Sequence, residues 1–206
     1  MIVSRLKRLF VGGSEGNEQL TLAVAALLIV LLAVDGATIL QIRSLLTTHA
    51  FVGMLLIPLV ALKLASTGWR MLRYYQRGEE YVLQRPPHVA LRMVVTPVLV
   101  LSTLFVFGTG VALLALGQTH GTLIGLHKAS FLVWAGAFGL HVLVHLIELP
   151  RLRRLRIPGV VLRIALVTAS VAAGLVLAIE TLPAADRLQD HAAAHVGVDG
   201  RKSAAS

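Results

Sequence analysis

Four histidines and Lys63 lie within apolar stretches of this 206-residue chain, and their spacing repeats on two predicted helices. Lys63 follows His49 by 14 residues, His141 follows His127 by the same interval, and His145 lies one turn further on. A step of 14 residues returns to nearly the same face of an α-helix and advances about 21 Å. The spacing therefore predicts two matching stripes of nitrogen bases. Two such stripes suit a flat cofactor held between two helices at each level.

The chemistry that fits these stripes is axial ligation of haem iron, because neutral imidazole is a good iron ligand within apolar walls. Small residues near the histidines, namely Gly53, Gly136 and Gly139, would let a broad porphyrin approach the helix backbones. The chain has no cysteine, which excludes iron–sulfur clusters, covalently attached haem, thiolate zinc sites and disulfides. The expected cofactor is haem b.

Each histidine also has an alternative interpretation. His49 and His127 open their apolar segments, where a histidine can simply be solvated at the membrane interface. His141 lies deeper and can serve as a structural hydrogen-bond partner, although a polar residue within a membrane is a functional hypothesis by default. His145 lies near an arginine-rich segment, where its role can be unrelated to a cofactor.

Two charged residues within the apolar segments are also open to more than one interpretation. Lys63 can extend its side chain to the inner headgroups, or it can compensate the charge of a haem propionate or a quinone oxygen. Asp35 can pair with Arg43 or accept a proton. The pattern of residues does not select between these roles.

The elements that must position these residues are membrane-spanning helices. The chain is 56% hydrophobic and only 14% charged, whereas soluble domains are about a quarter charged. This excludes a soluble enzyme, a disordered chain and a disulfide scaffold. Five segments reach the roughly 20 apolar residues that a bilayer requires: Leu20–Gln41, His49–Gly68, Val89–Leu116, Ile124–Leu149 and Ile157–Thr181.

The predicted fold is therefore an all-α, five-helix transmembrane bundle, with the histidine stripes on helices two and four. Residues 1–19 form a basic segment that can lie on the membrane as an amphipathic helix. Residues 20–181 form the transmembrane domain. Residues 182–206 are polar and rich in small residues, and we expect a disordered C-terminal tail.

The positive charge of the chain predicts its orientation. The formal net charge is +9, and 13 Lys and Arg residues fall at the N-terminus and in the second and fourth connections, against five on the other side. This bias predicts that the N-terminus is inside and the C-terminus outside. The bilayer then explains the basic composition without nucleic acid. The expected location is the inner (plasma) membrane of the cell, as a multi-pass protein.

The two stripes resemble the transmembrane cytochrome b superfamily, in which two helices each carry two histidines 13 to 14 residues apart. The segments HAFVGMLLIPLVALK (His49–Lys63) and HKASFLVWAGAFGLH (His127–His141) carry the resemblance. The resemblance implies that His49 and His127 bind the iron of an outer haem. Lys63 stands where the family has a histidine, so an inner haem with His141 is absent, uses Lys63, or is ligated by His145 and His88. The stretch STGWRMLRYY is also similar to uncharacterised bacterial five-helix membrane proteins.

The resemblance implies an electron-transfer subunit of an oxidoreductase, which exchanges electrons between quinone and a redox partner subunit. Two alternatives belong to other classes. One is a haem-free structural or assembly subunit of a membrane complex. The other is a small transporter or proton-conducting protein that uses Asp35, Lys63, His141 and His145.

Overall fold

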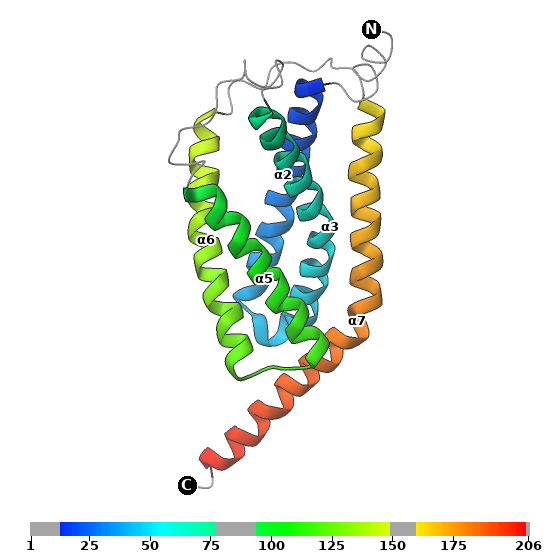
Figure 1. Ribbon diagram of the computed structural model, residues 1–206. Coiled ribbons are helices and arrows are strands. Elements are labelled where there is room, and N and C mark those ends of the chain that lie inside the picture. Colours follow the sequence, from blue (N-terminus) through cyan, green and yellow to red (C-terminus); the bar gives the residue numbers. More distant parts are fainter. Residues whose placement is uncertain (1–12, 77–93, 149–159, 205–206) are drawn as a thin grey trace.

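The computed structural model describes residues 13–76, 94–148 and 160–204, and this part of the chain contains five helices and no strand (Figure 1). The basic segment predicted for residues 1–19 lies mostly outside the described residues, and the first helix already begins at Gly13. The helices are α2 (Gly13–Ile39), α3 (Ile42–Tyr75), α5 (Thr96–Leu116), α6 (Thr122–Glu148) and α7 (Val160–Ala204).

Two tight turns join the helices into antiparallel hairpins. Leu40 and Gln41 connect α2 to α3, and the Leu40 and Gln41 amides donate to the Ala37 and Thr38 carbonyls at 3.2 Å. Gly117 ends α5 with a left-handed φ of 64°, a conformation that glycine adopts without steric cost. Both turns lie at the lower end of the bundle in Figure 1, which we call the turn end.

Helix α3 is the centre of the bundle. Its buried residues Val52, Leu56 and Leu59 form one core with three buried side chains of α2, and residues of α5 and α7 pack against this core. Helix α7 approaches α3 so closely at Gly174 that a Cβ atom there would overlap the Leu55 carbonyl oxygen. Helix α6, in contrast, packs mainly against α5.

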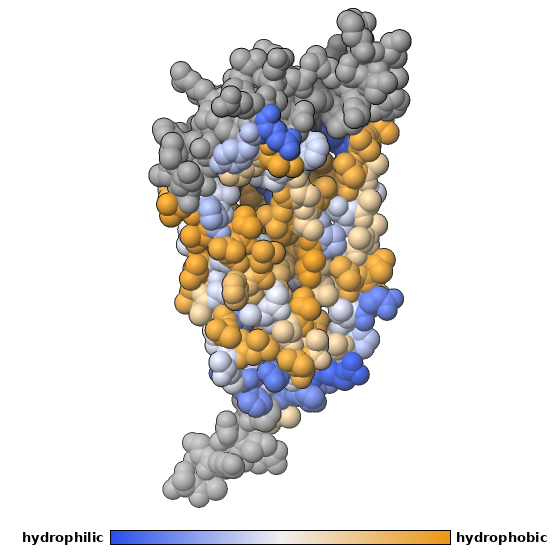
Figure 2. Space-filling model, in the orientation of Figure 1, coloured by the Kyte–Doolittle hydropathy of each residue, from blue (hydrophilic) through white to orange (hydrophobic). Residues whose placement is uncertain are grey.

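The surface of the bundle is apolar. All five described helices are long and apolar enough to cross a membrane. The structure is therefore compatible with a multi-pass membrane protein. On the face shown in Figure 2, apolar residues cover the middle of the bundle and hydrophilic residues gather at the turn end. Soluble monomers rarely expose so much contiguous apolar surface. Many large apolar side chains are exposed, including Phe105, Leu132, Val161 and Ile179.

The structure of the C-terminal segment differs from what the sequence predicts. The sequence favours a disordered tail from residue 182, whereas the structure continues α7 to Ala204. The physical reason lies in two residues on one face of the helix. Ala185 and Leu188 are buried against Leu114 of α5 and the first turns of α3. The Thr47 amide also donates to Oε1 of Gln189 at 2.9 Å, next to the non-helical Leu45.

Candidate functional site

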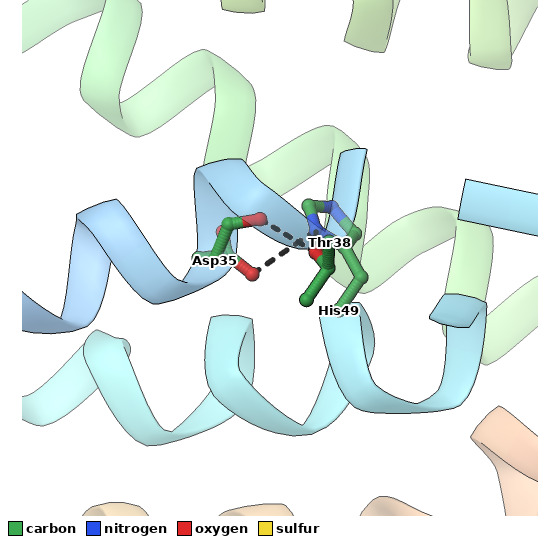
Figure 3. A network of polar contacts seen from close by, with 3 residues as sticks. All are labelled: Asp35, Thr38 and His49. Carbon is green, nitrogen blue, oxygen red and sulfur yellow. Dashed lines mark hydrogen bonds and ion pairs between the residues drawn. The ribbon is translucent and has the colours of Figure 1, made fainter. Parts of the chain in front are cut away.

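A polar cluster of Asp35, Thr38 and His49 lies at the turn end, between α2 and α3 (Figure 3). His49 Nδ1 lies 3.0 Å from Oδ1 of Asp35 and 3.1 Å from Oγ1 of Thr38. The side chains of His49 and Asp35 are only 23% and 16% exposed. The Asp35 carboxylate therefore lies beside His49, whereas one interpretation of the sequence paired it with Arg43.

The hydrogen bonds of Thr38 determine which nitrogen of His49 carries a proton. The single hydroxyl proton of Thr38 is donated to the backbone carbonyl of Asp35, so Oγ1 can only accept from the histidine. The Asp35 carboxylate is also an acceptor when ionised. Because Nδ1 faces two acceptors, the proton of the neutral ring sits on Nδ1. Nε2 is then the nitrogen with the free lone pair.

His127 has a matching environment in the other hairpin. Its Nδ1 lies 3.0 Å from Oγ1 of Thr109, and this hydroxyl donates to the Phe105 carbonyl at 2.7 Å. By the same reasoning His127 donates from Nδ1 and keeps its lone pair on Nε2. The ring also lies against Gly110, where an added Cβ would be 3.2 Å from Cε1 of His127.

The two histidines thus repeat one arrangement at one end of the bundle. Each ring comes from the second helix of a hairpin, and each Nδ1 is bound by a threonine of the first helix. Helices α3 and α6, which carry the rings, pack mainly against other helices and not against each other. The structure therefore places two lone-pair nitrogens near the turn end.

Lys63 lies towards the opposite end of α3 and binds α2. Its Nζ donates to the Thr21 carbonyl at 2.9 Å. Around it, Thr21 Oγ1 lies 3.1 Å from Oγ of Ser66, and Asn17 Nδ2 donates to the Ser66 carbonyl at 3.0 Å. The lysine therefore belongs to a polar network, the Lys63 clasp (Asn17, Thr21, Lys63 and Ser66), that joins α2 to α3.

The other candidate ligands are less defined by the structure. His141 is half-buried on α6, and its role as an inner haem ligand stays a prediction. His145 lies on α6, but its side chain is outside the described part, as is the whole of His88. Among the described residues, no group of three or more His, Cys, Asp or Glu side chains could hold a bare metal ion.

The partners of the histidines were missed in the sequence, although a signal for Asp35 and Thr109 was present. In a tight antiparallel hairpin, residues equidistant from the turn lie at equal depth. Asp35 and His49 lie seven residues before and after Ile42, and Thr21 and Lys63 lie 21 residues before and after it. Thr109 and His127 lie nine residues either side of Gln118. Their equal depth could have suggested these pairs. The sequence does not show how each helix is rotated about its axis, so it could not show whether the side chains of a pair face each other.

Comparison with known proteins identifies no relative of this chain. No family model, curated protein or solved structure matches the chain. The resemblance to transmembrane cytochromes b therefore stays a prediction from the histidine spacing.

Proposed function

We propose that this protein is a b-type cytochrome of the plasma membrane, an electron-transfer subunit in which His49 and His127 bind one haem. The observation that carries the proposal is that each Nδ1 lies beside a threonine hydroxyl whose own proton is donated to a backbone carbonyl. Histidines that bind metals almost always donate their other ring N–H to a carboxylate, carbonyl or water, which fixes the ring and its tautomer. The threonine contacts favour donation from Nδ1 in both rings, which leaves Nε2 for a ligand.

The surrounding residues also fit this cofactor. Two axial nitrogens suffice for a haem, so the lack of a three-residue metal cluster among the described side chains does not conflict with the proposal. When bound, the haem supplies the one-electron chemistry. The chain orients the two rings through Thr38 and Thr109. The outer position of the site, the quinone exchange and the redox partner subunit belong to the proposal.

The proposal comprises one haem, and it does not use Lys63 as a ligand. The ammonium group of Lys63 is bound to the Thr21 carbonyl on α2, and it lies 14 residues, or about 21 Å, from His49 along α3. The expected haem-to-protein ratio is therefore about one.

The experiment is the absorption spectrum of the purified full-length protein from haem-replete cells. Dithionite should produce the sharp α-band of six-coordinate haem b, and acid–acetone should extract the haem. His49→Ala and His127→Ala should each abolish the low-spin signal, whereas His120→Ala, at an exposed turn position, should preserve it. A colourless wild-type protein would overturn the proposal.

A pair of glycine variants tests the position of the His127 ring. Gly110→Ala should lower the haem content, because its Cβ would press on Cε1 of His127. Gly108→Ala lies on the same helix, and an added Cβ there meets no atom within 4 Å among the described residues. Its haem content should equal that of the wild type. Equal loading of both variants would argue against ligation by His127 in this position.

A second candidate function is proton conduction, and the ion pair of Asp35 and His49 favours it. A buried carboxylate beside an imidazole is a plausible relay within a membrane. The predicted transporter would also use Lys63, which the structure places about 21 Å from this pair and bonded to α2. Proton flux into liposomes containing haem-free protein, abolished by Asp35→Asn, would support this candidate over the cytochrome.

A further inference from the structure

The two histidines of the site are not equivalent. Each Nδ1 contacts one threonine hydroxyl, at 3.1 Å for His49 and 3.0 Å for His127. Only His49 has a carboxylate beside the same nitrogen, at 3.0 Å. The structure thus contains one ring with a neutral partner and one ring with an added negative charge.

The carboxylate of Asp35 has few other polar contacts in the described part of the chain. Its Oδ1 is buried and accepts no hydrogen bond from the described residues, and it lies 3.0 Å from Nδ1 of His49. The neighbouring carbonyl of Asp35 is bound by the Thr38 hydroxyl. An uncompensated buried carboxylate is costly, so its position beside the ring requires a specific reason.

Resting on the proposed haem site, we propose that Asp35 is a positioning residue that lowers the reduction potential of the haem through His49. The negative charge of a carboxylate 3.0 Å from Nδ1 makes the ring a stronger donor to the metal. A stronger donor and a nearby negative charge both stabilise the ferric state over the ferrous state. The two axial ligands would therefore differ in strength, with His49 the stronger.

The test is a redox titration of full-length protein, with the haem-to-protein ratio measured for every variant. Asp35→Asn keeps the shape and removes the charge, so the ratio of reduced to oxidised haem at a fixed potential should rise at least tenfold. For a one-electron couple this is a positive shift of about 59 mV. Asp35→Glu should remain closer to the wild type, because it retains the charge.

Two threonine variants provide the matched controls. Thr38→Val and Thr109→Val each remove one neutral hydroxyl contact, and each should change the potential less than Asp35→Asn. An Asp35→Asn protein with full haem and the wild-type potential would overturn the inference while leaving the proposed function intact. A colourless wild-type protein would overturn both.

A measurement on the wild type keeps the test valid if Asp35→Asn fails to fold. Infrared difference spectra between oxidised and reduced protein, with and without ¹³C-labelled aspartate, should contain a labelled carboxylate band that shifts on reduction. Exposed aspartates such as Asp186 and Asp190 should not respond. A difference spectrum without an aspartate band would overturn the inference.

Discussion

Lys63 illustrates at the residue scale how a charge is accommodated within an apolar helix. Its Nζ binds the Thr21 carbonyl, and the buried Thr21 and Ser66 hydroxyls lie beside it. Interhelical polar contacts of this kind compensate the cost of a polar atom in a membrane. The lysine thereby joins α2 to α3, a role that the sequence interpretations of headgroup contact and cofactor charge did not include.

The corresponding prediction is that replacing Lys63 lowers the stability of the bundle and leaves the proposed haem site intact. Lys63→Met should lower the stability of the bundle by about 1–2 kcal/mol, the range of interhelical hydrogen bonds in membranes, because it removes the bond to Thr21. Lys128→Met, at an exposed position, should have little effect. Thermal unfolding in detergent measures both. If Lys63→Met retained its stability and lost the haem band, the lysine would serve the cofactor instead.

At the scale of elements, hydropathy was sufficient to predict the helices. The five predicted spans correspond to the five described helices, because runs of about 20 apolar residues have few alternatives. The extension of α7 was missed because Asp186, Arg187 and Asp190 make the segment polar on average. Ala185 and Leu188, which are buried, recur at helical spacing within it.

The stripes of the candidate site could be predicted only in part. The spacing correctly placed His49 and Lys63 on one face of α3, and both contact α2. Which helix this face of α3 contacts depends on how the helices are rotated and packed. A single sequence with few polar residues does not determine that packing. For this reason Thr38, Thr109 and the pairing of Asp35 were identified only in the structure.

Helix packing makes a prediction at the same scale. Gly174→Ala should destabilise the protein by about 1–3 kcal/mol, the usual cost of overpacking, because its Cβ would overlap the Leu55 carbonyl. Gly139→Ala on α6 meets no described atom within 4 Å and should be neutral or slightly stabilising. Unfolding temperatures of the two variants in one detergent compare them. Equal temperatures would contradict the close contact of α3 and α7.

At the scale of the whole molecule, the five described helices place the start of α2 and the end of α7 at opposite ends (Figure 1). We predict that the start is cytoplasmic, because the sequence has 13 basic residues in and around the N-terminal, second and fourth connecting segments, against five in the others. A reporter fused after Ser206 should be active outside the cell, and one inserted at Gly78 should be active inside. The opposite result would place His49 and His127 on the cytoplasmic side.

The close packing of α7 on α3 also has a consequence for how the chain is made. Between the end of α3 at Tyr75 and the start of α7 at Val160, 84 further residues must leave the ribosome. At about 5–20 residues per second this takes roughly 4–17 s. During that interval the α2–α3 and α5–α6 hairpins can form locally, while the Leu55 backbone of α3 faces lipid in place of Gly174. The last of the five described helices to be synthesised therefore completes the packing around α3, and a nascent chain interrupted before Val160 would leave α3 open to membrane quality control.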